Sequence, residues 1–301
     1  MQVQLEASNF QQTLVKLRNE TESLILQRLA RVGARSRADL ARDIGVTRST
    51  VGAPTARFLD LGLLRVADDS SPETTSLAKR SGRPGERLEL APDICAFVGI
   101  EISVDWIRVG LADLQGTLHS VQEQPIPSSQ KSPDTVIDNL IDLIRKVIQG
   151  QPAVAGIAVS VPGIVTADYH VLRAPLMGWR DVALGERLRE AFPDITNIDV
   201  RNDASQFAAS LSLSNPALLE GNAVIAWLDA GIGGGIVAGG VPIQGHGNLA
   251  GEIGHMFVSS RPNDQLRRLE DIIGSQSLLA RYAELGGKGE TIKALLDRHR
   301  Q

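Results

Sequence analysis

The chain has 301 residues, of which 43% are hydrophobic and 22% are charged, and its formal net charge is −4. This is the composition of a globular protein long enough for two domains, so a disordered chain, a collagen and a coiled coil are excluded as descriptions of the whole. The sequence has no secretory signal, no run of about 18 apolar residues and no cysteine besides Cys95, which predicts a cytoplasmic protein without membrane contact, disulfide or cysteine-based zinc site.

Charge is unevenly distributed along the chain. Residues 1–90 carry 14 Lys and Arg against 11 Asp and Glu, whereas residues 91–301 carry 17 against 24. A basic N-terminal part ahead of an acidic body is typical of a nucleic-acid-binding domain, and an aromatic content of 4% argues against platforms that stack single-stranded bases. We therefore predict two domains, residues 1–90 and residues 91–301, with double-stranded DNA as the partner of the first.

Three short helices are predicted in the first domain. Residues 22–32 place apolar side chains along one helical face. Ser36, with Asp39 three residues later, forms a capping-box-like start for a second helix. Thr47 caps the third helix, in which Pro54 predicts a kink or a restart. Three helices with a glycine-containing turn between the second and third indicate a helix-turn-helix.

Residues 34–65 closely resemble the winged helix-turn-helix domains of repressors. The resemblance implies that the third helix enters the major groove of operator DNA and that the hairpin between Leu64 and Leu90 is the wing. The residues expected to contact DNA lie on this helix and in the basic wing loop, and they are Thr47, Arg48, Ser49, Thr50, Arg57, Arg80 and Arg83. Two alternatives remain open: a winged domain that contacts only proteins, and a wing segment that is a solvated linker.

The pattern changes to strands from about residue 94. Alternating apolar residues predict three strands between residues 95 and 124, followed by an amphipathic helix over residues 134–150. Further elements follow in the order strand, strand, helix and strand, at residues 154–163, 195–200, 203–213 and 222–228. The last strand is expected to run into a glycine-rich turn at residues 231–235. Strands and helices mixed in this order predict an α/β body.

Residues 94 to about 282 resemble the ROK family (repressor, ORF, kinase). The most specific stretch runs from Gly231 to Met256, GIGGGIVAGGVPIQGHGNLAGEIGHM, and follows the family pattern of spaced glycines that ends in Ala-Gly-Glu-x-Gly-His. The resemblance implies an actin-like ATPase fold. With a winged helix-turn-helix ahead of it, the resemblance narrows to sugar-responsive transcriptional repressors of the N-acetylglucosamine or xylose type, expected to act as a homodimer or a higher homo-oligomer.

The resemblance also implies a site for a small sugar effector. Its residues are Asn202, Asp203, Glu252, His255 and Glu270, whose carboxylates, amide and imidazole suit the hydroxyl groups of a polyol. In kinases of the family, the aspartate that matches Asp203 takes a proton from the sugar hydroxyl, whereas here Asp203 is expected only to bind. In the alternative interpretation, Asn202 and Asp203 simply cap the following helix and His255 is a hydrogen-bonded core histidine.

Both phosphate loops depart from the family pattern. Glu101-Ile102-Ser103 replaces Asp-x-Gly in the first, and Asp229-Ala230-Gly231 replaces Gly-Thr-Gly in the second, so a carboxylate stands where a glycine would face phosphate. ATP is therefore not expected as a cofactor, and no catalytic activity is predicted. The alternatives are an active sugar kinase with an accessory DNA-binding domain and a repressor whose sugar pocket no longer binds.

Three further departures concern the sugar side and the end of the chain. Leu176 stands where the family commonly places a sugar-contacting asparagine. Residues 260–270 lack the three cysteines of the family's zinc loop, so no metal is expected. The chain also ends earlier than a ROK body, which predicts a truncated body.

The expected mechanism is a population shift, in which bound sugar changes the spacing of the DNA-binding domains and thereby the affinity for DNA.

Overall fold

The computed structural model describes residues 20–68, 85–151, 153–215, 218, 221–228, 231–259, 265–287 and 291–292. Arg80, Arg83 and Asp229, to which the sequence assigns roles, lie outside these residues. The chain forms two compact units, Met1–Val159 with Ala183–Val200 and Ser160–Val182 with Arg201–Gln301. Among the described residues, no helix combines the length and the apolar composition that crossing a membrane requires.

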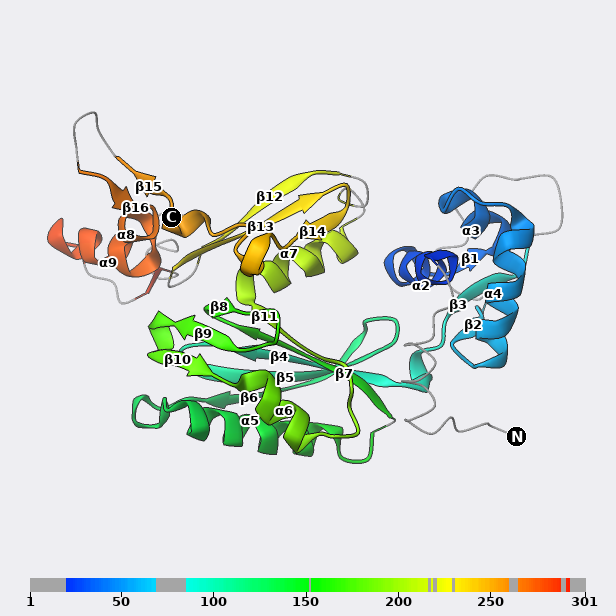
Figure 1. The fold of residues 1–301 in the computed structure, drawn as a ribbon, viewed down its shortest axis with the longest axis horizontal. Coiled ribbons are helices and arrows are strands. Elements are labelled where there is room, and N and C mark those ends of the chain that lie inside the picture. Colours follow the sequence, from blue (N-terminus) through cyan, green and yellow to red (C-terminus); the bar gives the residue numbers. More distant parts are fainter. Residues whose placement is uncertain are drawn as a thin grey trace. The chain divides into compact units, whose positions relative to one another are not determined.

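The first unit begins with three helices and a small sheet, coloured blue to teal in Figure 1. The helices are α2 (Glu20–Val32), α3 (Arg37–Asp43) and α4 (Arg48–Asp60). An antiparallel sheet in the order β1-β3-β2 is formed by β1 (Arg35–Ser36), β2 (Leu64–Val66) and β3 (Arg87–Leu90). The hydroxyl of Ser36 accepts a hydrogen bond from the amide of Asp39 and caps α3, which confirms the predicted start of this helix.

α4 runs through Pro54 without interruption, so the predicted restart is wrong. The ring of Pro54 is buried, and the hydroxyl of Thr55 donates to the carbonyl oxygens of Val51 at 2.9 Å and of Gly52 at 3.0 Å. A proline inside a helix costs roughly 3 kcal/mol because one backbone hydrogen bond is lost. Burial of the ring in the core opposes this cost and allows the helix to continue.

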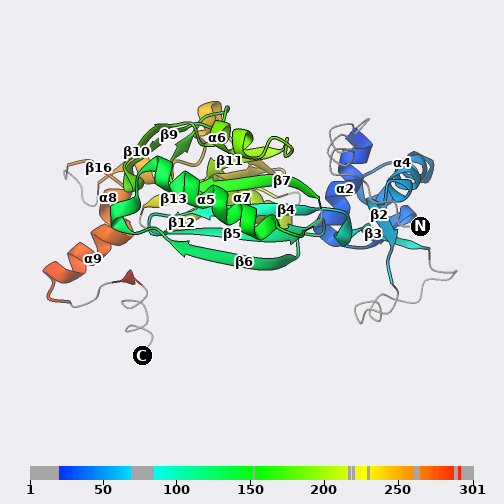
Figure 2. The same ribbon diagram turned by 90° about the horizontal axis from the view of Figure 1, so that it is seen from below.

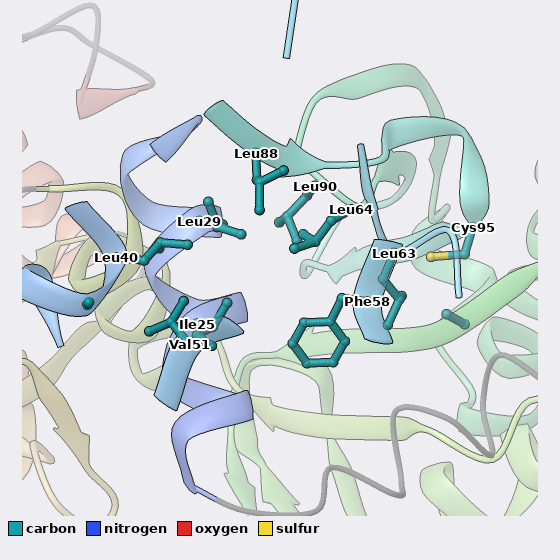
Figure 3. Close-up of a cluster of buried hydrophobic side chains, with 12 residues drawn as sticks. Ile25, Leu29, Leu40, Val51, Phe58, Leu63, Leu64, Leu88, Leu90 and Cys95 are labelled. Atoms are coloured by element: carbon teal, nitrogen blue, oxygen red, sulfur yellow. The ribbon is translucent and has the colours of Figure 1, made fainter. Parts of the chain in front are cut away.

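A cluster of buried apolar side chains holds the three helices and the small sheet together, as Figure 3 shows. Each helix contributes residues to this cluster, and so do β2, β3 and the turn between α4 and β2. The main ones are Ile25, Leu29, Leu40, Val51, Phe58, Leu63, Leu64, Leu88 and Leu90. Burial of one such side chain contributes about 1.5–3 kcal/mol. The same cluster extends to Cys95 and Ala155, which belong to the body of the unit.

A five-stranded sheet follows in the first unit, with the strand order β11-β7-β4-β5-β6. Its strands are β4 (Ala96–Ile102), β5 (Trp106–Asp113), β6 (Leu118–Pro125), β7 (Val154–Val161) and β11 (Ile198–Asn202). β4, β5 and β6 are antiparallel neighbours, which confirms the three strands predicted between residues 95 and 124. Helices α5 (Pro133–Ile148) and α6 (Leu184–Ala191) lie on one face of the sheet (Figure 1, Figure 2).

The turn between β5 and β6 is hydrogen-bonded to the end of β3 in the small sheet. The side-chain amide of Gln115 donates a hydrogen bond of 2.7 Å to the carbonyl of Leu90, the last residue of β3. Asp113 shapes this turn, since its Oδ1 accepts from the amides of Gln115 and Thr117. Burial, reinforced by the charge of Asp113, raises the pKa of the Cys95 thiol to about 12. The helical region and the five-stranded sheet therefore share both a core and a direct hydrogen bond.

The described part of the second unit contains three small antiparallel sheets. The first has the order β10-β9-β8 and consists of β8 (Ile164–Val165), β9 (Val171–Ala174) and β10 (Trp179–Val182). The second consists of β12 (Ala223–Leu228), β13 (Ile232–Ala238) and β14 (Val241–Ile243), with α7 (Asp203–Ser214) along one face (Figure 1). The third pairs β15 (Phe257–Val258) with β16 (Arg267–Arg268), and α8 (Glu270–Ile273) and α9 (Ser275–Glu284) follow it (Figure 2).

Close packing of α7 on β13 depends on glycines. A Cβ on Gly233 would lie 2.5 Å from the Cβ of Ala204, and a Cβ on Gly235 would overlap Ala208. The prediction of a glycine-rich turn at residues 231–235 is therefore wrong for its last four residues, which belong to a strand. These glycines are needed because only a strand without side chains lets a helix approach this closely.

Candidate functional site

The N-terminal turn of α4 presents four exposed polar residues. Thr47 is the N-cap, and its Oγ1 accepts from the amide of Thr50 at 3.3 Å and lies 2.7 Å from the hydroxyls of Ser49 and Thr50. Arg48, Ser49 and Thr50 are exposed, whereas Val51 is fully buried in the core. The unpaired backbone amides of a helix start carry partial positive charge, so this turn is suited to contact phosphates and base edges.

Arg57, further along α4, has its guanidinium engaged within the first unit. Its Nε and Nη2 donate to the two carboxylate oxygens of Glu22 in α2, at 3.1 and 2.7 Å. The side chain of Glu22 is 4% exposed, and that of Arg57 is 22% exposed. The pair joins α2 to α4, which gives Arg57 a place in the fold besides its predicted contact with DNA.

The strands expected to form the wing pair as a hairpin. β2 and β3 are antiparallel, in register from Leu64 opposite Leu90 to Val66 opposite Leu88. The basic loop between them lies outside the described residues, so the predicted DNA contacts of its arginines stay predictions.

The first expected phosphate loop is the turn between β4 and β5, and its carboxylates are already paired. Glu101 lies 3.4 Å from Nη1 of Arg108, and Asp105 lies 3.0 Å from Nζ of Lys131. The pKa of Arg108 is raised, mainly by its hydrogen bond to Glu123 and to a smaller extent by Glu101. Each of these carboxylates therefore has a cation as its partner, and Ser103 adds a side chain where the family pattern has a glycine.

The first two residues of the expected sugar site stand where β11 passes directly into α7. Asn202 caps α7, because its Oδ1 accepts from the amide of Ser205 at 3.1 Å, and its Nδ2 donates to the carbonyl of Gly163 at 3.0 Å. Asp203 is half-buried, and its Oδ1 accepts from the amide of Ala204 at 2.8 Å. Both polar ends of the Asn202 side chain therefore serve the fold, as the capping interpretation expects.

The structure brings Glu252, His255 and Glu270 together. Nε2 of His255 lies 3.5 Å from Oε1 of Glu270. Burial raises the pKa of Glu252 above its ordinary value, with an opposing influence from His255 and a further rise from the charge of Glu270. Because the side chain of His255 is 47% exposed, it is not a buried core histidine. The cluster offers two carboxylates and an imidazole, which suits a ligand that both donates and accepts hydrogen bonds.

The segment that carries Glu252 and His255 packs against β13 through two glycines, Gly251 and Gly254, which leave the two backbones close together. A Cβ on Gly251 would lie 2.5 Å from the carbonyl oxygen of Gly234, and a Cβ on Gly254 would overlap the carbonyl oxygen of Ile232. Gly251 also has a φ of +89°, which L side chains rarely adopt. The two glycines are the direct chain neighbours of Glu252 and His255, so they set the position of these side chains relative to β13.

The beginning of β13 also links this cluster to the start of α7. A Cβ on Gly231 would lie 3.6 Å from Oε2 of Glu270, and Gly233 packs against Ala204, the residue after Asp203. Residues two apart along a strand are separated by about 7 Å. Asp203 and Glu270 therefore border the same end of β13, which allows the five expected residues to belong to one site.

Two polar residues that the sequence did not single out are Arg268, which contacts Glu270, and Asn248, which bonds to the backbone of β8. Nη1 of Arg268 lies 3.5 Å from Oε1 of Glu270. Asn248 has a φ of +60° and donates from its Nδ2 to the carbonyl of Val165 at 3.1 Å. Arg268 lies within residues 260–270, which depart from the family pattern, so the resemblance could not assign it a role. Asn248 is a residue type that tolerates positive φ, but nothing in the sequence indicates its distant partner.

Two further features concern the composition of the site. Leu176 is exposed on a short 3-10 turn, Pro175–Met177, in the second unit. Within the described residues, no group of three His, Cys, Asp or Glu side chains is arranged to hold a metal ion. The polar character of the site therefore rests on carboxylates, imidazole and guanidinium.

Known proteins share this fold and these motifs. Residues 97–292 match the family model described as ROK family. The chain is 28% identical to the xylose repressor of Bacillus spizizenii over 251 residues, which is 82% of this chain and 62% of the repressor. It is 31% identical to the N-acetyl-D-glucosamine kinase of Pectobacterium atrosepticum over 183 residues, 59% of this chain and 55% of the kinase.

A solved structure gives the same fold over most of the chain. It is that of a ROK family transcriptional regulator, a homolog of the E. coli MLC protein, with a TM-score of 0.69 and 21% identity. The similarity covers 90% of this chain and 70% of that protein. The chain spans less than two thirds of the length of the xylose repressor that it resembles.

Proposed function

Because the chain belongs to the ROK family, we propose that it is a cytoplasmic, sugar-responsive transcriptional regulator. Residues 1–90 form a winged helix-turn-helix that binds operator DNA, and residues 91–301 form an actin-like body that binds a sugar or sugar derivative. The protein acts as a homodimeric repressor and has no kinase activity.

The observation that carries this proposal is the extent of the similarity to a repressor. Only nine residues follow the ROK match at residues 97–292, yet the match with the xylose repressor covers 82% of the chain. That match must therefore extend ahead of the body to about residue 55 or earlier, which takes in at least the end of α4 and the β2–β3 hairpin. The N-acetyl-D-glucosamine kinase covers 59%, a share that the body alone accounts for.

DNA recognition centres on the start of α4. The exposed guanidinium of Arg48 can donate two hydrogen bonds to a guanine edge. The hydroxyls of Ser49 and Thr50 reach phosphates, and the methyl group of Thr50 can contact a thymine methyl. Arg80 and Arg83 of the wing loop add contacts to the backbone or the minor groove. One small domain gives limited affinity, so two copies bind a two-fold symmetric operator.

The sugar binds where the start of α7 meets the cluster on β13. Asp203, Glu252 and Glu270 accept hydrogen bonds from sugar hydroxyls, and His255 accepts or donates according to its tautomer. Asn202 holds the start of α7 in place through its two backbone contacts. A sugar that binds one state of the body more tightly shifts the population toward that state, and this shift changes DNA affinity.

A sugar kinase is the second candidate, favoured by the identity to the N-acetyl-D-glucosamine kinase. In that case Asp203 is the base that takes the proton from the sugar hydroxyl. The departures of both phosphate loops from the family pattern oppose it, with Ser103 and Asp229 in place of glycines. An assay of ADP release with a panel of sugars separates the two candidates. We expect no sugar-dependent release; release that Asp203→Asn abolishes would establish the kinase instead.

The proposal is tested by DNA selection and titration with the full chain. Duplexes enriched from a random pool are titrated by fluorescence anisotropy at two salt concentrations, with and without D-xylose, D-glucose and N-acetyl-D-glucosamine. We expect sequence-preferring, salt-sensitive binding with a dissociation constant of about 10 nM or below, which one sugar shifts. Binding that no sugar changes would support a repressor with an inactive pocket. A folded chain without sequence preference would refute a DNA-binding function.

The role of Arg48 gives a sharper prediction. Arg48→Ala should weaken binding to the selected duplex by about 10- to 100-fold, since a bidentate arginine–guanine contact is worth roughly 1–3 kcal/mol. Its melting temperature should match that of the wild type because the side chain is exposed. Arg145→Ala serves as the control, since Arg145 is an exposed arginine on α5 paired with Asp142. Equal losses of affinity in both variants would contradict a specific role for Arg48.

A further inference from the structure

The two chain segments that bear His255 and Glu270 are joined by a two-stranded ribbon. Phe257 and Val258 of β15 pair with Arg268 and Arg267 of β16. The amide of Leu269 also donates to the carbonyl of Met256, at 2.8 Å. His255 stands two residues before the start of β15, and Glu270 stands two residues after the end of β16. The ribbon therefore determines how far these two side chains lie from each other.

The guanidinium of Arg268 lies against the same carboxylate as His255. Nη1 of Arg268 and Nε2 of His255 are each 3.5 Å from Oε1 of Glu270. Arg267, its neighbour on β16, donates to the carbonyl of Asp271 at 2.6 Å. The side chain of Glu270 is 25% exposed, so its attraction to a cation is less screened than that of a surface pair. Two arginines of one strand thus contact Glu270 and Asp271, the first two residues of α8.

Zinc does not fit this region. The family's zinc loop brings three thiolates and a histidine to one tetrahedral site. Residues 256–270 contain no cysteine, and the described residues hold no group of three metal-ligating side chains. The cation beside Glu270 is instead a guanidinium, which would repel a divalent metal ion at that carboxylate.

We propose that Arg268 is the positioning residue of the sugar site, and that it and the β15–β16 ribbon form a metal-free clamp on Glu270 and His255. Arg268 acts through Glu270, whose carboxylate it holds beside the imidazole. The consequence for ligand binding rests on the proposed function, whereas the clamp itself is a property of the folded chain. Removal of the guanidinium frees the Glu270 carboxylate and loosens the ribbon.

The clamp is tested by hydrogen exchange on the full chain, without any sugar. In Arg268→Gln the amide of Leu269 should exchange about tenfold faster or more, because the local opening that frees it becomes less costly. Arg281→Gln is the matched control, since Arg281 pairs with Glu284 on α9 at 2.8 Å. Exchange at Leu269 that stays the same in Arg268→Gln, or that rises equally in both variants, would overturn the proposal.

A double-variant cycle separates positioning from a general loss of structure. If Arg268 acts through Glu270, exchange at Leu269 in the double variant Arg268→Gln/Glu270→Gln should equal that in Glu270→Gln alone. Additive effects would overturn the proposed route. A second measurement on the wild type tests whether a metal ion contributes. Hydrogen exchange at Leu269 should be unchanged by EDTA and by added Zn²⁺. One tightly bound zinc per chain, with loss of protection in EDTA, would also overturn the clamp.

The ligand consequence is measured separately. With a sugar found by the titration described above, Arg268→Gln should weaken sugar affinity about tenfold, whereas the control Arg281→Gln should bind the sugar as the wild type does. Arg268→Lys should recover part of the loss because it keeps the charge. Unchanged sugar affinity would refute the positioning role. If no sugar binds the wild type, the sugar-sensing function fails, and the exchange experiments still decide whether the clamp exists.

Discussion

Glu22 is a carboxylate placed inside the apolar core of the helical region. Its side chain is 4% exposed, and both of its oxygens accept hydrogen bonds from Arg57. A buried pair of this kind adds little over apolar residues of the same size, but loss of one partner leaves a charge without its main compensation. The pair therefore holds α2 against α4 mainly because separating the two helices would deprive the buried Glu22 carboxylate of Arg57.

Arg57→Met tests this role. The variant keeps most of the aliphatic packing and should lower the stability of α2 and α4 by about 2–3 kcal/mol, near the low end for a broken buried pair because Arg57 is partly exposed. Native-state hydrogen exchange of amides in the two helices measures this change. The double variant Glu22→Leu/Arg57→Met should restore most of the loss. Unchanged exchange in Arg57→Met would show that the pair contributes nothing.

Glu252 makes stability depend on pH. Burial raises its pKa above the ordinary value, so the folded chain holds this proton more tightly than the unfolded chain does. The resulting stabilisation is full below the ordinary glutamate pKa of about 4.3 and is lost as the pH rises through the raised value. Glu252→Gln cannot ionise and keeps its stability. Its melting temperature should therefore rise relative to the wild type as the pH increases above about 4. The exposed Glu190→Gln is the control, and parallel curves for Glu252→Gln and the wild type would contradict the prediction.

At the scale of elements, the glycines of β13 determine how its neighbours pack, because they carry no side chain. Glycines at positions 233 and 235 admit α7 on one side, and Gly234 admits the backbone of Gly251 on the other. A strand with ordinary side chains would push these segments apart by several ångströms. The position of Asp203 relative to Glu252 and Glu270 thus depends on missing Cβ atoms.

Gly235→Ala is the direct test of this arrangement. The added methyl would overlap Ala208, so the variant should lose about 1–3 kcal/mol of stability, as overpacked cores do. Ala208→Gly in the same chain should recover part of the loss, because it removes the opposing methyl. Gly99→Ala on β4 is the matched control, since a Cβ there meets nothing within 4 Å. Thermal melting that is the same for Gly235→Ala and Gly99→Ala would contradict the close packing.

Local signals predict elements well and their contacts poorly. The cap at Ser36 and the apolar stripe of α5 are encoded within a few residues, so sequence alone places them. The continuation of α4 through Pro54 depends on burial of its ring in a core that local pattern does not describe. The strand character of Gly233 to Gly235 likewise depends on α7, which supplies the packing that glycine itself cannot.

At the scale of the whole molecule, the candidate site was only partly predictable. The residues expected to bind sugar follow from the family resemblance, and the structure brings Glu252, His255 and Glu270 together. Arg268 was missed, because its partner is a carboxylate whose neighbourhood forms only when β15 and β16 pair. The two compact units follow from contacts between chain segments that are distant in sequence, which local patterns do not describe, and the predicted domains 1–90 and 91–301 stay predictions.

The hydrogen bond from Gln115 to Leu90 limits how this protein can be re-engineered. A chimeric regulator joins a DNA-binding domain to an unrelated sensor domain through a linker. A graft cut after residue 90 would remove the donor for the Leu90 carbonyl and strip Cys95 and Ala155 from the core that they complete. A transplantable version of this DNA-reading part must therefore bring the turn at residues 113–117 and the strands beside it, or supply substitutes for both.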